Sequence, residues 1–393
     1  MAMKKFWMLL LMLALVRLGL MATTPVFDPS EARYAAISAN MARTGDYVVP
    51  HFTYKGVYQS FDGKPPLVFQ AGGLFCEWFG INEFAVRLFP FLSAVLLLTI
   101  LYGTVKRWSN EESARFAVIV CASSTAFYAS AGLSMTDMTL ACCVAGALLL
   151  YARGFVGTKK MRVADCLGVA VLLGAGMIVK GPVALVLFGL PVLVDAIVNR
   201  HWWAIFDWRW LIAAPIFLLV AAPWFILVER VNPGSVWYFF YNENFLRFVS
   251  HDYGDKYGAG REAFRGVAII WAAVACLPWT LLVPFKKPAW KDFFGLSVIS
   301  ITLFWCLTSR VLVYYLFPMI PLFAAYLALY GDHTRLRRFA PWCAGLSVVV
   351  LVGALVGGMF FSDKMQGAKT EFSAHGSTYS YEFYHGTHPS AIK

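Results

Sequence analysis

Residues 27–67 read FDPSEARYAAISANMARTGDYVVPHFTYKGVYQSFDGKPPL and form the longest polar interruption in the first half of an otherwise apolar chain. The stretch opens with two carboxylates, Asp28 and Glu31, and closes with a lone lysine, Lys64, before two prolines. Charged side chains are costly inside a bilayer, so a polar segment between apolar runs is expected at a membrane surface. We therefore predict that the rest of the chain holds this segment there.

The composition predicts an integral membrane protein. Hydrophobic residues make up 60% of the 393 residues, aromatic residues 17% and charged residues 14%. Soluble domains carry about 25% charged residues, and no soluble core could bury so much apolar surface. The eight cysteines form no C-x-x-C motif, so the sequence indicates neither a disulfide framework nor a zinc site.

About eleven apolar runs are long enough to cross the hydrocarbon core of a bilayer, so we predict an all-α polytopic bundle. The first run follows Lys4-Lys5 and imitates a signal peptide, but it reaches about twenty residues, which favours a retained helix. The runs cover residues 6–24, 84–105, 113–132, 136–156, 164–179, 182–198, 210–228, 266–285, 292–309, 313–330 and 340–361.

The basic clusters predict the orientation of these runs. With the N-terminus in the cytoplasm, every short cytoplasmic connection is basic, as the positive-inside rule requires. Residues 25–83, 229–265 and 362–393 are then extracytoplasmic, and we expect the functional site on that side. Residues 1–361 are expected to form the transmembrane domain, and 362–393 a short tail.

Asp28 and Glu31 stand at the start of the first of two amphipathic helices that we expect in the first loop, over residues 29–44 and 66–79. A carboxylate at the membrane surface can act as general base on an incoming hydroxyl. The same residues also fit a helix cap, with Asp28 as N-cap and Glu31 at N3. The local sequence leaves both interpretations open.

Four ordered motifs resemble those of the ArnT-like bacterial glycosyltransferases, which are relatives of the protein O-mannosyltransferases with the GT-C fold. In the first loop an acidic pair runs into E-x-R-Y, followed by G-D-Y-V-V-P and K-P-P. The other motifs are T-D-x-x-L-A from Thr136, V-K-G-P from Val179 and R-x-x-x-Y-Y-L-x-P-x-x-P from Arg310. The resemblance covers residues 1 to about 330, after which full-length members carry further helices and a folded extracytoplasmic domain.

The resemblance implies a metal-independent, inverting transferase that needs no cofactor and takes its sugar from a polyprenyl phosphate. Asp28 or Glu31 would accept the proton of the acceptor. The family often has two adjacent acids, whereas here Ser30 lies beside Glu31, so the resemblance does not decide which one is the base. Lys64 and Arg310, with Arg33 and Lys180, would bind the donor phosphate. The implied substrate-binding residues are Asp137, Tyr34, Tyr314, Tyr315, Asp62 and Arg247.

The implied location is the bacterial inner membrane, with the active site on the periplasmic side. Lipid A, lipopolysaccharide or another glycolipid is the first choice of acceptor, and a secreted protein is the second; membrane lipids are expected as partners, and nucleic acid is not. An alternative of another class is a secondary transporter or lipid flippase, which predicts midplane charges and an inverted repeat. The charges here lie near the outer ends of the runs and no repeat is found, which favours the transferase.

Overall fold

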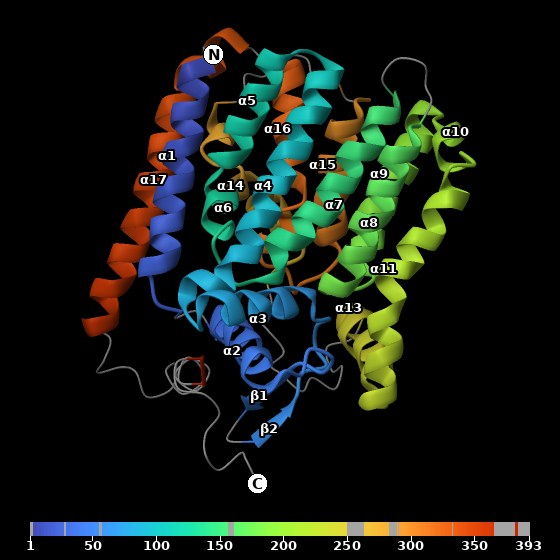
Figure 1. Ribbon diagram of the computed structural model, residues 1–393. Coiled ribbons are helices and arrows are strands. Elements are labelled where there is room, and N and C mark those ends of the chain that lie inside the picture. Colours follow the sequence, from blue (N-terminus) through green and yellow to red (C-terminus); the bar gives the residue numbers. More distant parts are fainter. Residues whose placement is uncertain are drawn as a thin grey trace.

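The chain folds into a helical bundle with a small layer of helices and one hairpin at one end, as the computed structural model shows (Figure 1). The N-terminus lies at the opposite end of the bundle from this layer. The structure describes residues 3–26, 29–54, 57–155, 161–249, 263–282, 289, 291–331, 333–364 and 382–383.

The bundle is built from eleven helices within the described residues, joined by shorter elements. Its helices are α1 (Met3–Thr23), α4 (Glu83–Trp108), α5 (Glu111–Ala122), α7 (Thr136–Ala152), α8 (Val163–Lys180), α9 (Val183–Asn199), α11 (Trp210–Val231), α14 (Val267–Ala275), α15 (Phe293–Cys306), α16 (Met319–Tyr330) and α17 (His333–Lys364). The connecting elements are α6 (Thr125–Ser130), η1 (Arg153–Phe155), α10 (Trp202–Ile205), α12 (Ser235–Trp237), the π-helix η2 (Tyr238–Leu246), α13 (Arg247–Val249), η3 (Trp279–Leu281) and η4 (Val313–Leu316).

The protein is a multi-pass membrane protein. By length and composition, α1, α4, α8 and α11 can each cross a bilayer. Other apolar helices are shorter; α7 and α9, for example, have 17 residues each. The expected number of about eleven membrane crossings therefore stays a prediction.

Helix α7 lies at the centre of the bundle. All of its residues are buried, and it packs against α4, α8, α9 and α16. A helix that is apolar on every side must be covered on every side, which explains why α7 shows no amphipathic period. Its first turn faces the end of the bundle where the first loop lies (Figure 1).

The first loop folds into α2 (Pro29–Thr44), a hairpin of β1 (His51–Tyr54) and β2 (Val57–Ser60), and α3 (Leu67–Phe79). The antiparallel strands pair His51 with Ser60. The prediction of an all-α chain is wrong for this hairpin. Two strands of four residues each are too short for their alternation of side chains to be recognised in the sequence. Helices occupy both segments where loop helices were expected, but their place at a membrane surface stays a prediction.

Two residues of the C-terminal segment pack against the first loop. The carboxylate of Glu382 accepts hydrogen bonds from the Thr53 amide at 3.0 Å, and Arg43 donates to the carbonyl oxygens of Glu382 and Phe383 at 3.0 and 2.8 Å. The Phe383 side chain is fully buried. The predicted division into residues 1–361 and a tail of 362–393 stays a prediction, since α17 extends to Lys364.

Candidate active site

A cavity of about 310 Å³ lies beside the π-helix η2, at the adjoining ends of α8, α9 and α15. Four cations line it, Lys64, Lys180, Arg247 and Arg310, and Glu243 is the one carboxylate among its described lining residues. The wall on the side of the bundle is apolar and includes Val183, Val186, Phe304 and Trp305. A cavity with these two kinds of wall suits an anion joined to an apolar chain.

Lys180 is held at the cavity by an acid and two aromatic rings. Its Nζ donates to Asp137 Oδ1 at 2.6 Å and lies 4.4 Å from the ring centre of Tyr315 and 5.9 Å from that of Tyr314. Asp137 stands in the first turn of α7 and Lys180 ends α8, so each charge complements the dipole of its own helix. The geometry makes Lys180 a fixed rather than a mobile charge.

Glu243 is the functional candidate that the sequence reasoning missed. Its carboxylate is buried, 3.5 Å from Lys64 Nζ and 3.1 Å from Arg247 Nη1, and it accepts a hydrogen bond from the Tyr238 hydroxyl at 3.3 Å. Arg247 also donates to the Tyr315 hydroxyl at 3.4 Å. The signal in the sequence was the spacing of four residues between Glu243 and Arg247.

Lys64 reaches the cavity from the loop before α3. Its Nζ donates to the Gly63 carbonyl oxygen at 2.6 Å. Burial lowers the pKa of the ammonium to about 8, while the negative charge of Glu243 opposes that shift. Arg247 and the other nearby cations lower the pKa further. An anion bound beside Lys64 would therefore stabilise the charged form of this lysine.

Asp62 does not line the cavity but holds the Lys64 loop in place. Its Oδ1 accepts hydrogen bonds from Asn232 Nδ2 at 2.9 Å and from Ser235 Oγ at 3.0 Å, both beyond the end of α11. These contacts join the first loop to the segment that leads into η2. Asp62 thus positions the loop in this structure, and its substrate contact stays a prediction.

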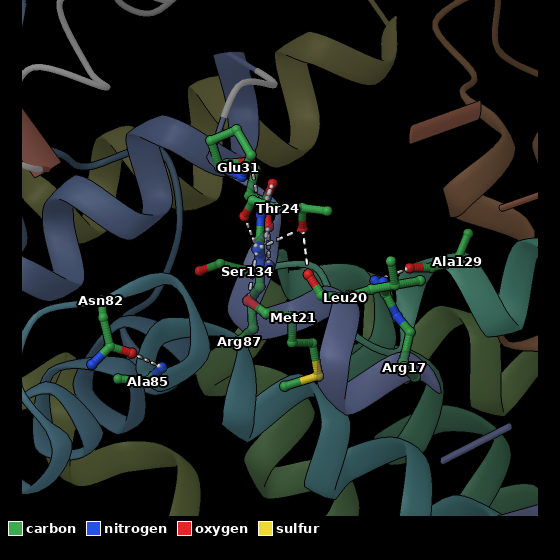
Figure 2. A network of polar contacts seen from close by, with 11 residues as sticks. Arg17, Leu20, Met21, Thr24, Glu31, Asn82, Ala85, Arg87, Ala129 and Ser134 are labelled. Carbon is green, nitrogen blue, oxygen red and sulfur yellow. Dashed lines mark hydrogen bonds and ion pairs between the residues drawn. The ribbon is translucent and has the colours of Figure 1, made fainter. Parts of the chain in front are cut away.

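Glu31 lies in a buried network rather than in the cavity, as Figure 2 shows. Its two carboxylate oxygens accept from Arg87 at 2.8 and 3.1 Å, and Oε1 also accepts from the Ser134 amide at 3.0 Å. Arg87 in turn donates to backbone oxygens at the end of α1, at Met21 and Thr24. The network thus joins α1, α2, α4 and the turn before α7.

Arg33 and Tyr34 follow Glu31 within one turn of α2. The Arg33 guanidinium lies 5.2 Å from the ring centre of Phe61, and the Tyr34 ring packs 5.2 Å from that of Phe69. Neither residue lines the cavity. Asp28, the other predicted base, lies outside the described residues.

The structure thus brings together Lys64, Lys180, Arg247, Arg310 and Tyr315, with Asp137 and Tyr314 behind Lys180. Such an arrangement can bind a phosphate and stabilise negative charge that develops on it. Arginine can grip phosphate oxygens through paired hydrogen bonds, whereas lysine supplies a compact point charge. Within the described residues no group of three or more His, Cys, Asp or Glu side chains is close enough together to hold a metal ion.

Comparison with known proteins bears on the family and the fold of this chain. Residues 63–227 match the model of the dolichyl-phosphate-mannose-protein mannosyltransferase family. The structure of ArnT from Cupriavidus metallidurans bound to undecaprenyl phosphate superposes with a TM-score of 0.73 at 21% identity, covering 100% of this chain and 77% of that one. The resemblance to the ArnT-like family is confirmed. The ArnT-type bundle is accordingly the fold of this chain.

Curated relatives are undecaprenyl phosphate-alpha-4-amino-4-deoxy-L-arabinose arabinosyl transferases. The ArnT-type protein of Serratia proteamaculans is 27% identical over 91% of this chain, and that of Erwinia tasmaniensis is 28% identical over 68%. The matches cover 64% and 47% of those proteins. The chain therefore spans about half to two thirds of the length of the curated relatives.

Proposed function

We propose that this protein is a membrane glycosyltransferase that moves a sugar from a polyprenyl phosphate to an extracytoplasmic acceptor, with inversion at the sugar. The observation that carries the proposal is the cavity in which Lys64, Lys180, Arg247 and Arg310 face an apolar wall. The cations would bind the phosphate of a prenyl phosphate, and the apolar wall would contact its prenyl chain. The curated relatives, which are named for an undecaprenyl phosphate-linked sugar, support this donor class.

Our first choice of acceptor, which follows from the resemblance to the ArnT-like family, is a glycolipid such as lipid A. A secreted protein is the second candidate, and it is supported by the match to the dolichyl-phosphate-mannose-protein mannosyltransferase family. We further propose that the protein lies in the bacterial inner membrane with a cytoplasmic N-terminus. The layer that contains α2 and α3 would then face the periplasm together with the cation-lined cavity.

We assign the base to Asp28 and a structural role to Glu31. Both oxygens of Glu31 are occupied by Arg87, and the buried pair holds the start of α2 in place. A carboxylate whose two oxygens both bond Arg87 is engaged in holding α2 rather than in contacting an acceptor. In the proposed step, the acceptor oxygen loses its proton to Asp28 and bonds to the sugar C1, while the bond from C1 to the phosphate oxygen breaks on the opposite face. Lys64 and the three other cations bind the phosphate as its charge grows.

Purified protein with a radiolabelled polyprenyl-phosphate sugar tests the proposal. Asp28→Asn should abolish transfer to added lipid A while donor binding persists, and Lys64→Ala should weaken donor binding itself. Glu31→Gln should lower the thermal stability instead, since it leaves Arg87 buried without its counter-ion. Glu111→Gln, at an exposed position in α5, is the matched control. Full transfer by Asp28→Asn would remove Asp28 as the base, and movement of lipid without transfer by the wild type would support a flippase instead.

A further inference from the structure

One buried side chain, Arg87 of α4, contacts both ends of residues 24–31, the segment that contains the proposed base (Figure 2). At the first end, its Nη1 donates to the Thr24 carbonyl oxygen at 2.6 Å and its Nη2 to the Pro25 carbonyl oxygen at 3.3 Å. At the other end, Nε and Nη2 donate to the two carboxylate oxygens of Glu31 at 2.8 and 3.1 Å. A single guanidinium thus joins the end of α1 to the start of α2.

These contacts use the whole guanidinium of Arg87. Its Nη1 also donates to the Met21 carbonyl oxygen and to the Thr24 hydroxyl, both at 3.0 Å, so each of its three nitrogens donates hydrogen bonds. Arginine presents five N–H groups in a planar fork, whereas lysine presents three on one nitrogen. A lysine could therefore keep the charge opposite Glu31 but could not bond both ends of the segment.

The chain between the two anchors is short. Asp28 stands three residues from Pro25 and three from Glu31, so its Cα lies within about 11 Å of both. Prolines occupy positions 25 and 29, and each fixes its own φ angle. The place of the proposed base therefore depends on where Arg87 holds the two anchors.

The same network extends to the cation-lined cavity. The Ser134 amide donates to Glu31 Oε1 at 3.0 Å, and Asp137, three residues later, binds Lys180 at 2.6 Å. Burial raises the pKa of the Tyr34 phenol in α2, and the charges of Asp137 and Lys180 also act on it. The start of α2 thus lies near the cations that would bind the donor phosphate.

We propose that Arg87 is a positioning residue for the base: by binding both ends of residues 24–31, it fixes where Asp28 meets the acceptor hydroxyl. The proposal rests on the proposed glycosyltransferase function. A buried ion pair is weak evidence for stability, because the cost of desolvation can exceed the attraction between the charges. The contacts of Arg87 instead define the course of the chain, and misplacing a catalytic group by about 1 Å can cost about a hundredfold in rate.

Three variants of the full-length protein test this role. Arg87→Lys keeps the charge but loses the fork, and Thr24→Val removes one acceptor of Arg87 while keeping the carbonyl acceptors. Arg17→Lys is the matched control, because Arg17 is a second arginine of the same region and is 3% exposed (Figure 2). Its Nη2 donates to the Ala129 carbonyl oxygen at 2.6 Å, outside the segment that carries the base.

Each variant is measured in nanodiscs with undecaprenyl phosphate-alpha-4-amino-4-deoxy-L-arabinose as donor and with lipid A or a serine-rich peptide as acceptor. Arg87→Lys should lower kcat by about tenfold to a hundredfold, and Thr24→Val by about threefold. Both should leave the Kd of the donor unchanged and should accelerate hydrogen exchange in residues 24–31. Arg17→Lys should leave kcat and this exchange unchanged.

Faster exchange in Arg87→Lys with an unchanged kcat would overturn the positioning role and leave Arg87 as a structural contact. An equal loss of kcat in Arg17→Lys would also overturn it, because general destabilisation would then explain both variants. If Arg87→Lys does not fold, an unchanged kcat in Thr24→Val decides against the proposal. These results refute the role of Arg87 alone, whereas a wild type that transfers sugar to neither acceptor would refute the glycosyltransferase itself.

Discussion

Lys64 is charged at a cost, because its surroundings exclude water and hold three other cations. Burial lowers its pKa to about 8, so the empty site begins to lose the proton as the pH rises through that value. A bound phosphate favours the ammonium, and donor binding above pH 8 must therefore take up a proton.

We predict that the affinity of the wild type for a polyprenyl phosphodiester falls as the pH rises from 7 to 9.5, by up to about tenfold per unit above the pKa of Lys64. Lys64→Arg should give a flatter profile, because a guanidinium keeps its charge throughout this range. Equilibrium binding in nanodiscs measures both profiles. The same slope in Lys64→Arg would assign the titration to another group.

Glu243 affects the same equilibrium in two opposite ways. Its charge competes with the phosphate for Lys64 and Arg247, but it also raises the pKa of Lys64. Glu243→Gln should therefore bind the donor more tightly at pH 6.5, where Lys64 is charged in either protein, and should lose affinity from a lower pH than the wild type. Glu243→Asp, which keeps the charge, is the control. Binding curves that differ by a constant factor at every pH would contradict this account.

At the scale of elements, the tight turn between α8 and α9 depends on Gly181. Its φ of +80° is a conformation that side chains disfavour, and a Cβ there would lie 2.5 Å from the Phe239 ring in η2. The turn therefore packs the end of α8, which carries Lys180, closely against Phe239 of the π-helix η2.

Gly181→Ala should destabilise the protein by about 1–2 kcal/mol from backbone strain alone, and should weaken donor binding because Phe239 and η2 have to move. Gly189→Ala is the matched control: that glycine lies within α9, where a Cβ meets no atom within 4 Å, and a helical alanine is favoured by about 1 kcal/mol. Thermal unfolding and donor binding measure both effects. Donor affinity unchanged in Gly181→Ala would show that η2 does not shape the cavity.

The sequence predicted the elements with strong local signals and missed those defined by contacts across the fold. Pro29 and Gly45 mark the ends of α2, so its bounds could be read directly. Arg87 passed unnoticed inside an apolar run, because nothing local shows that Glu31 lies opposite it across 56 residues of sequence. Glu243 had one local signal, its spacing of four residues from Arg247, but its π-helical setting has no recognisable sequence pattern.

For the candidate site, the motifs led to Lys64, Lys180, Arg310 and Arg247, which the structure gathers around one cavity. They could not distinguish these residues from Asp62, which lies in the same loop as Lys64 but bonds Asn232 and Ser235 instead. Orientation within a loop depends on its tertiary partners, which a motif does not encode.

At the scale of the whole molecule, the C-terminal segment contacts the first loop across more than 300 residues of sequence. Phe383 is buried against that loop, and Glu382 bonds Thr53 in β1. This contact attaches residues 382–383 to the layer of helices and hairpin that lies at the end of the bundle opposite the N-terminus (Figure 1).

We predict that Phe383→Ala, which removes a buried ring worth about 3–5 kcal/mol, releases the hairpin locally without unfolding the bundle. Hydrogen exchange in residues 45–60 should accelerate, while exchange in α7 stays unchanged. Val57→Ala, at an exposed position in β2, is the control. Slow exchange of the hairpin in Phe383→Ala would show that the contact contributes little to holding it.

The excess of cations in the cation-lined cavity also bears on the proposed turnover. A donor phosphodiester carries one negative charge, whereas the prenyl phosphate that remains after transfer carries up to two near neutral pH. Among the described residues, Glu243 and Asp137 are the carboxylates that pair with the four cations, and the remaining positive charge attracts the second species more strongly than the first. If the cavity stabilises the departing phosphate as proposed, it also retains it. The spent carrier should then inhibit sugar transfer, and its release should limit the rate.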